Sequence, residues 1–437
     1  GNRGVLVPFA DSDSIARELI ALLHDEPRRH AMRKKAYLLG REMVWSNVAH
    51  LYMEAFHKAR SSRPSHIARA RAIKTLEEQN RQLPAIRLDH LAKMTDSTGM
   101  LQHAIFSIPR FNDGYCTDDN ARALLLTVIL NEIGHDTAQV QSLAKIYAAF
   151  LNHAFNSARK RFRNFMSYDR RWIEEAGSED SHSRALWALG TCVGRSKQRD
   201  LQVWASQLFD QALPTITEFH SPRAWAFGLL GIHEYLRHLK GNRLANQIRD
   251  KLTHRLITLY EHTSSENWPW FEELLAYDNA KLSHALLLTA QCCRDEKALN
   301  IGLHSLRWLI QIQTAQTGHF RPIGSEGWYP RGGIKANYDQ QPILVHANVS
   351  ACLEAFRATE DKYWLDQARN IFEWFLGRND LGSMVYDSAT GGCRDALQVD
   401  RLSQNQGAES TLAWMLALSE MYSMEHSLNV FNRPRES

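Results

Sequence analysis

The sequence is poor in cysteine for its length, and its six cysteines form no recognisable pattern. They lie far apart except for the adjacent pair Cys292 and Cys293, which leaves neither paired CxxC metal motifs nor a dense disulfide framework. The 20 histidines show no HExxH-like spacing of metal ligands. We therefore expect no metal and no cofactor, and we expect reduced thiols in a cytoplasmic protein.

Long apolar runs and an excess of charge of one sign are also missing. The longest apolar run, Ala123–Leu130 with Thr127 inside it, is far too short for a membrane span, and no secretory signal opens the sequence. The net charge is only +4, from 52 basic and 48 acidic residues, and the basic residues are scattered. We therefore expect no membrane span and no nucleic acid partner.

Hydrophobic residues make up 44% of the chain, which is ample for a large core, and the first 60 residues differ from the rest. The apolar run Gly4–Phe9 predicts a strand, and Asp11 begins an Asp-Ser-Asp-Ser helix start. Helical spacing continues from Ile15 to Leu23, around 28–40, and from Trp45 onward. The predicted strand needs a partner that the nearby sequence does not offer.

Five short motifs in this segment carry a resemblance: Gly4-Val-Leu-Val-Pro-Phe, Asp13-Ser-Ile-Ala, Leu22-Leu-His-Asp, Met32-Arg and Trp45-Ser-Asn-Val-Ala-His-Leu-Tyr. Together they resemble the C-terminal tail of a family 4 glycosyltransferase of the GT-B type. The resemblance implies that residues 1–60 are the C-terminal remnant of a GT-B α/β glycosyltransferase domain, and that this upstream glycosyltransferase domain is fused to the rest of the chain. The chain begins at Gly1, so we expect a fragment of a longer protein. Because that family's nucleotide-sugar contacts lie upstream, we expect no donor-sugar turnover by this chain.

Residues 61–88 are rich in Arg, Ser and Gln and predict a linker, after which helical patterns dominate to residue 437. Six helices with apolar, small-residue bodies are predicted to begin near Asp118, Asp180, Pro222, Asp278, Gln340 and Ala408. More amphipathic helices are predicted near 137–155, 197–211, 242–262, 296–313 and 361–377. A helix that is apolar all round is expected to be buried on every side, whereas a helix with a single apolar stripe is expected at the surface of the domain. The alternation predicts a mainly α fold for 89–437, an (α/α)6 toroid with an inner and an outer ring; an open helical solenoid is the alternative.

The predicted inner helices repeat an acidic start. Asp118-x-x-x-Arg122-Ala-Leu matches Asp180-x-x-x-Arg184-Ala-Leu, and Asp119-Asn-Ala-Arg is echoed by Asp278-Asn-Ala-Lys. These acidic residues are therefore expected to gather at one rim of the toroid. Sugars present apolar ring faces and polar edges, so aromatic platforms beside carboxylates suit a sugar site, and paired carboxylates suit glycoside hydrolysis.

These patterns predict two sets of site residues. The catalytic candidates are Asp118, Asp119, Asp180, Glu273 and Asp339, with Asp118 or Asp119 and Glu273 as the preferred pair. The substrate-binding candidates are Tyr115, Arg122, His182, Trp268, Trp270, Asp278, Trp328 and Tyr338. Structural alternatives stay open for many of them: the aspartates can cap helices or pair with arginines four residues away, and the two indoles can pack within their loop.

A second resemblance spans about residues 89–424. Asp113-Gly-Tyr-x-x-Asp-Asp-Asn-Ala-Arg-Ala-Leu, Glu179-Asp-Ser-His-Ser-Arg-Ala-Leu-Trp-Ala-Leu-Gly and Gly407-Ala-Glu-Ser-Thr-Leu-Ala-Trp resemble the six-hairpin glycosidase-like domains fused behind family 4 glycosyltransferases. The resemblance implies an oligosaccharide or polysaccharide ligand but selects no reaction. Three hypotheses follow: a glycoside hydrolase-like enzyme, a non-catalytic glycan-holding module, and a sugar epimerase that uses His182 and His284 for proton transfer.

Overall fold

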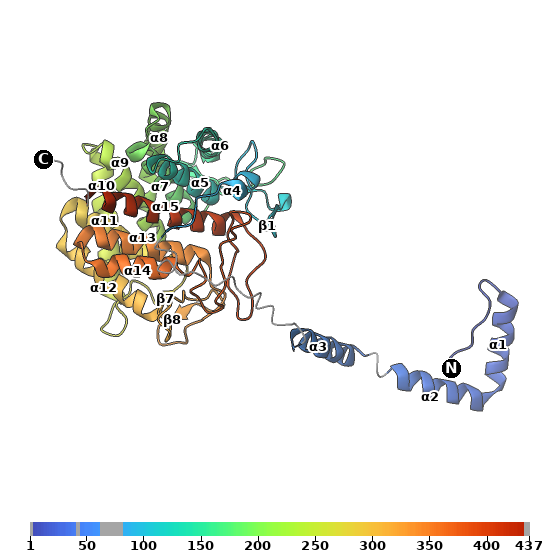
Figure 1. The fold of residues 1–437 in the computed structure, drawn as a ribbon. Helices are drawn as coiled ribbons and strands as arrows, with labels where there is room; N and C mark the ends of the chain where they lie inside the picture. Colours follow the sequence, from blue (N-terminus) through green and yellow to red (C-terminus); the bar gives the residue numbers. More distant parts are fainter. Residues whose placement is uncertain (1–2, 41–43, 62–81, 432–437) are drawn as a thin grey trace. The chain divides into compact units, whose positions relative to one another are not determined.

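The computed structural model in Figure 1 describes residues 3–40, 44–61 and 82–431. Contacts between Cα atoms divide the chain into two units, Gly1–Ala72 and Ile73–Ser437, which we describe separately. Within the described residues, every helix is too short or too polar to cross a lipid bilayer.

The first unit contains three helices, which are α1 (Ser12–His24), α2 (Glu26–Gly40) and α3 (Trp45–Ser61). The side chain of Asp11 caps α1 by accepting a hydrogen bond from the backbone N–H of Ser14. The predicted strand at Gly4–Phe9 is wrong, because this segment is irregular and its Leu6 and Phe9 side chains are fully exposed. A strand needs a neighbour for its backbone hydrogen bonds, and the described part of this unit offers none.

The predicted linker 61–88 lies mostly outside the described residues. Residues 82–88 are irregular, and Tyr422 Oη donates hydrogen bonds to the carbonyl oxygens of Leu83 and Pro84. This segment thereby lies against the last helix of the second unit.

The second unit is built from two sets of alternating helices. The inner helices are α5 (Thr117–Glu132), α7 (Glu179–Arg195), α9 (Pro222–His238), α11 (Ala280–Cys293), α13 (Pro342–Thr359) and α15 (Ala408–Phe431). The outer helices are α6 (Ala138–Ala154), α8 (Arg199–Ala212), α10 (Arg243–Thr263), α12 (Glu296–Ile312) and α14 (Lys362–Phe372). Each inner helix begins within two residues of its predicted start, whereas α14 ends before the predicted position 377.

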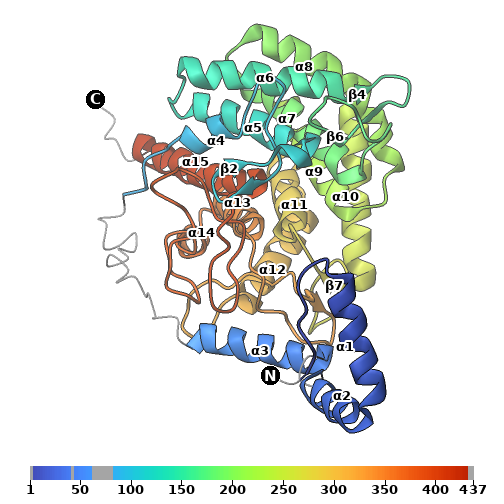
Figure 2. The same ribbon diagram turned by 90° about the vertical axis from the view of Figure 1, so that its right-hand side faces the viewer.

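The inner helices form a closed ring. Each one packs against the next along the chain, and α15 packs against α5. Outer helices α6 and α8 lie outside α5 and α7 (Figures 1 and 2). Short α4 (Asp89–Lys93) packs against α15 in place of a sixth long outer helix. Closure confirms the predicted toroid and is inconsistent with an open solenoid.

The inner and outer helices differ in how much of their surface is buried. Helix α5 buries every residue from Thr117 to Leu130 except Asp118, whereas α8 buries only four residues of one face. Side chains of Thr137, Ser178, Ser221, Asn242 and Asp295 cap the starts of five helices.

The segments between hairpins carry four antiparallel pairs of two-residue strands. The pairs are β1 (Ala104–Ile105) with β2 (Ile108–Pro109), β3 (Tyr115–Cys116) with β6 (Phe165–Met166), β4 (Phe155–Asn156) with β5 (Arg161–Phe162), and β7 (Leu274–Leu275) with β8 (Tyr329–Pro330). Short η2 (Phe111–Asp113) and η3 (Leu213–Glu218) complete these connections. Since the long connections precede the inner helices, they surround the N-terminal ends of those helices.

Glycines allow the closest helix contact of the ring, between α7 and α9. A Cβ at Gly190 would overlap the carbonyl oxygen of Gly231, and one at Gly231 would lie 2.6 Å from that of Leu186. We expect Gly190→Ala to lower the free energy of unfolding by about 1–3 kcal/mol or more, because backbone must move to admit the methyl group. Gly241→Ala is the matched control, since a Cβ there meets no atom within 4 Å. Equal urea midpoints for both variants would contradict this account of the contact.

Candidate functional site

Charged side chains meet where the inner helices begin. Arg122 of α5 lies at the centre of one group: its Nη2 atom is 2.9 Å from Asp118, 3.3 Å from Asp119 and 3.0 Å from Glu409 of α15. Arg122 is buried, whereas the Glu409 side chain is 46% exposed. The group therefore extends from the ring interior to solvent and ties the first inner helix to the last.

Arg184 of α7 continues this network. Its Nε atom lies 2.8 Å from Asp118, and its Nη2 atom donates a short hydrogen bond to Asp278, just before α11. Arg184 and Asp278 are almost completely buried. Residues 118, 122, 184, 278 and 409, scattered over most of the domain sequence, thus form one connected ionic network, as the repeated acidic starts predicted.

Helix capping, one of the structural alternatives, does not explain Asp118 or Asp180. Helix α5 has Cys116 as its N-cap, without a capping side chain, and α7 is capped by Ser178. Asp118 and Asp180 are therefore inside the first turns of their helices, and no capping hydrogen bond uses them. Asp118 instead pairs with arginines from two helices, which is a structural role that leaves function open.

Asp119 is the most chemically distinctive carboxyl group of the network. It is only 6% exposed, and burial raises its pKa to about 7, while Arg122 acts in the opposite direction and Asp118 adds to the rise. A carboxyl group with such a pKa holds its proton near neutral pH and can donate it. The sequence pattern did not distinguish Asp118 from Asp119 as the proton donor, whereas the deeper burial of Asp119 does.

A second polar group joins α9 to the segment before α11. Both Glu272 carboxylate oxygens accept hydrogen bonds from Arg223 Nη1, at 2.8 and 3.0 Å. Other atoms of Arg223 donate to Asn279 Oδ1 and to the carbonyl oxygen of Tyr277. Burial raises the pKa of Glu272 against the opposing effect of Arg223. Glu272, whose side chain is 24% exposed, is thus a partly buried carboxylate beside the network, and it was not among the predicted candidates.

Its neighbour Glu273, half of the preferred catalytic pair, is placed differently. The Glu273 side chain is 68% exposed and pairs with Arg331 at 3.0 Å. Arg331 also donates to the Thr263 carbonyl and to Ser265, at the end of outer helix α10. Glu273 is thus at the surface, and Glu272 is the less exposed carboxylate of this segment.

Two further catalytic candidates are partly buried. Asp180 accepts a hydrogen bond of 2.7 Å from Ser221 Oγ, and burial raises its pKa against that hydrogen bond. Burial also raises the pKa of Asp339, and the nearby Glu326 and Asp395 raise it further. Asp339 Oδ1 is buried and has no hydrogen-bond partner. Both groups remain candidates for a role in proton transfer.

The expected tryptophan platforms at 268 and 270 are not exposed. Trp268 is 4% exposed and Trp270 is completely buried. Both indoles contact Trp308 of outer helix α12, with ring centroids 5.0 and 6.1 Å away, and Trp268 Nε1 donates to the Glu272 carbonyl. Loop packing, the alternative left open above, therefore accounts for these residues, because three indoles together bury a large apolar area.

Other aromatic candidates are more accessible. Trp328 and Tyr338 are partly buried, and Tyr277, which was not a candidate, joins Trp328 beside a small apolar cluster at the starts of α13 and α15. The cluster consists of Ile343, Leu344 and Ala413. The ring of Tyr277 also lies 5.2 Å from the Arg223 guanidinium. Tyr277 and Trp328 are thus partly exposed aromatic side chains at the N-terminal ends of α13 and α15.

Tyr115 and His182 are structural residues. Tyr115 is buried and its hydroxyl donates to Asp96 at 2.6 Å. His182 Nδ1 accepts from the Phe162 N–H, so its Nε2 donates to the Ala212 carbonyl. Burial lowers the His182 pKa to about 3. Both ring nitrogens are thus occupied, and His182 cannot serve as the proton-transfer histidine of the epimerase hypothesis.

Deeper along the ring axis lies a second set of polar groups. Lys281 is fully buried, its Nζ has no hydrogen-bond partner, and it lies 4.8 Å from the Trp187 ring centroid. His346 Nε2 donates to Glu420, and His284 Nδ1 is buried without a partner. Glu420 was not among the predicted candidates, and the signal for it is an acidic residue within the apolar helix α15. The described residues contain no cluster of three or more side chains suited to a metal ion.

Comparison by sequence identifies no relative: no family model matches the chain, and no curated protein matches it significantly. Comparison by structure is informative about the fold. A cellobiose 2-epimerase from Bacillus thermoamylovorans matches with a TM-score of 0.61 and 11% identity, covering 78% of this chain and 96% of its own. The cellobiose 2-epimerase from Spirochaeta thermophila has a TM-score of 0.61 and 14% identity, covering 80% and 97%.

A GH76 α-mannanase from Bacteroides thetaiotaomicron matches with a TM-score of 0.52 and 9% identity, covering 72% of this chain and 88% of its own. Epimerases and a glycosidase thus share one architecture with this chain. At such low identity the likeness concerns architecture and not chemistry. The main body of the chain therefore has the (α/α)6 toroid fold that these sugar-processing enzymes share.

Proposed function

We propose that the toroid is a carbohydrate-active enzyme of the glycoside hydrolase-like type, acting on an oligosaccharide or polysaccharide at the N-terminal ends of the inner helices. The observation that carries this proposal is Asp119, a buried carboxyl group with a pKa of about 7 beside an ionic network that reaches solvent. Enzymes that cleave glycosidic bonds need one carboxylic acid that stays protonated near neutral pH and a second group that is negatively charged.

In the proposed reaction, Asp119 donates its proton to the glycosidic oxygen as the bond to the anomeric carbon breaks. A second carboxylate, from Asp118, Asp180, Asp339 or Glu272, removes a proton from the attacking water or attacks the anomeric carbon itself. Arg122 and Arg184 hold Asp118 in place from two helices. Tyr277 and Trp328 would contact the apolar face of the sugar ring.

The motifs at residues 4–52 support a further part of the proposal: the toroid belongs to a longer polypeptide with an upstream glycosyltransferase domain. In that setting the toroid would trim or hold the glycan made by the attached domain. The chain itself would not turn over a nucleotide sugar. Release of nucleotide from a nucleotide sugar by this purified chain would contradict that expectation.

A panel of reduced and unreduced oligosaccharides, incubated with the chain in deuterated water and followed by NMR, tests the proposed reaction. Hydrolysis gives new reducing ends, and their first anomeric signal reports inversion or retention. Incorporation of deuterium at a ring carbon without new reducing ends would instead establish an epimerase, which the fold accommodates equally well. Saturable binding with neither change would establish a glycan-holding module.

A further inference from the structure

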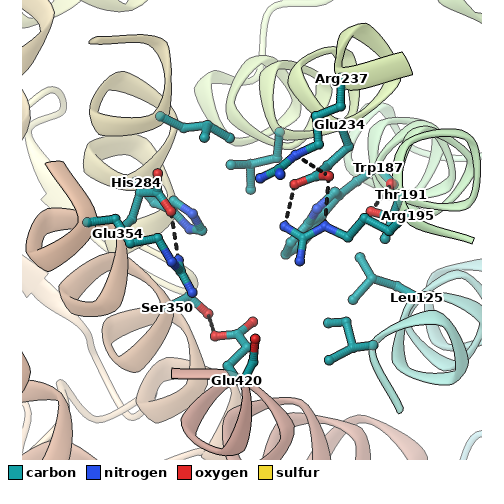
Figure 3. Close-up of a pocket in the computed structure, with 15 residues that line it drawn as sticks. Leu125, Trp187, Thr191, Arg195, Glu234, Arg237, His284, Ser350, Glu354 and Glu420 are labelled. Atoms are coloured by element: carbon teal, nitrogen blue, oxygen red, sulfur yellow. Dashed lines mark hydrogen bonds and ion pairs between the residues drawn. The ribbon is translucent and has the colours of Figure 1, made fainter. Parts of the chain in front are cut away.

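A cavity lies on the ring axis beyond the charged network, toward the C-terminal ends of the inner helices (Figure 3). All six inner helices line it. Its volume is about 60 Å³, and since a water molecule needs about 10–15 Å³ of such space, it holds about four to six waters. No residue of the proposed reaction lines it.

The outer end of this axial cavity carries three arginines, whose charges are matched by acidic neighbours. Arg195 donates two hydrogen bonds to Glu234, Arg237 lies 2.8 Å from the same carboxylate, and Arg357 donates to Glu354. Each arginine is in the last turn of its helix, where a positive charge stabilises the helix dipole. Each of these arginines is therefore already paired with a carboxylate and placed favourably at the end of a helix, which disfavours an anionic ligand.

The inner part of the axial cavity offers hydrogen-bond acceptors. Glu420 accepts one hydrogen bond from His346 and one from Ser350, so each carboxylate oxygen retains accepting capacity. Burial opposes its ionisation, but His346 and Lys281 lower its pKa to about 2. His284 is 8% exposed, burial lowers its pKa well below the usual range, and its Nδ1 has no partner. Figure 3 shows His284, Ser350 and Glu420 around the open centre.

The charge and polarity of the lining side chains limit which ligands the axial cavity can bind. The Glu420 carboxylate accepts hydrogen bonds only, so the inner part calls for a ligand that donates them, either a hydroxylated or an ammonium compound. The buried Lys281 already opposes the negative charge of Glu420, which disfavours a further cation. Leu125, Leu230 and Leu288 provide an apolar wall that suits a carbon skeleton. We propose that the axial cavity is a binding site for a small neutral polyol of three or four carbons, separate from the site at the N-terminal ends.

Ligand-observed NMR with glycerol and erythritol as probes tests this site in the full chain, with ethanolamine and inorganic phosphate as cationic and anionic comparisons. We expect saturation transfer from the protein to the two polyols alone. Ser423 lines the cavity and its hydroxyl makes no described contact, so Ser423→Phe should abolish the transfer. Ser427→Phe, one turn later on an exposed face of α15, should leave it unchanged.

A second variant avoids any effect of the bulky side chain on folding. Ser423→Cys can be alkylated with a benzyl reagent after folding, and the wild type treated alike controls for the exposed Cys292 and Cys293. We expect loss of polyol binding only in the alkylated variant. Equal transfer in blocked and unblocked protein, no transfer to either polyol, or transfer only to ethanolamine or phosphate would overturn the proposal. Asp119→Asn should leave polyol binding intact, which separates this test from that of the proposed reaction.

Discussion

Asp119→Asn should reduce the turnover of a cleavable oligosaccharide by about 10²–10⁴-fold, the usual contribution of a general acid. Asparagine has nearly the same shape but no proton to give to the departing oxygen. It also keeps the position filled beside Arg122, so the effect should fall on kcat more than on KM. Steady-state kinetics on the substrate found in the oligosaccharide panel measures it.

The pH profile gives the same prediction a second readout. Burial raises the Asp119 pKa to about 7, so the acid form is present below that pH and is lost as the pH rises through it. The kcat/KM of the wild type should therefore fall above about pH 7, and Asp119→Asn should lack this alkaline limb. Glu273→Gln is the matched control, because the exposed Glu273 pairs only at the surface with Arg331. Full turnover by Asp119→Asn, or a loss of turnover limited to Glu273→Gln, would reverse the assignment.

Arg184→Met should lower the free energy of unfolding by about 3–5 kcal/mol. Arg184 is 3% exposed and lies between Asp118 and Asp278, so its removal leaves buried Asp278 without its arginine and leaves Asp118 with Arg122 alone. Methionine fills similar volume, and the loss therefore reports charge rather than a cavity. Urea unfolding followed by tryptophan fluorescence measures the change.

Arg331→Met provides the comparison for that experiment. Its ion pair with Glu273 is largely exposed, and such pairs contribute at most about 1 kcal/mol. The double variant Arg184→Met with Asp278→Asn should cost less than the sum of the two single changes, since the two side chains form one pair. Similar losses for Arg184→Met and Arg331→Met would mean that the buried network does not hold the inner helices together.

Much of the fold was predictable from local pattern. Helices α5 and α13 carry small apolar residues on all sides, as an inner helix requires, and this composition can be read directly from the sequence. The Asp-x-x-x-Arg repeats also gave the correct end of the ring for the charged network. The strand at Gly4–Phe9 failed because a strand requires a partner, and an apolar run cannot supply one by itself.

The candidate site was predictable only in part. Glu272 and Glu273 are adjacent in the sequence, so position alone could not show which of the two is less exposed. Trp268 and Trp270 looked like exposed platforms because Trp308, which packs against both, is far away in the sequence. Only the positions of the loop and of α12 in the folded chain show which of these side chains are shielded from solvent.

The sequence by itself therefore determined the helices, their alternation and the end of the ring at which acidic residues gather, because helix formation and burial depend on spacing within one segment. Only the tertiary structure decided the chemistry of single groups. The pKa of Asp119 and the surroundings of Glu420 depend on solvent exclusion and on charges from other helices. Both effects arise when distant segments close the ring, and residue order along one helix carries no record of them.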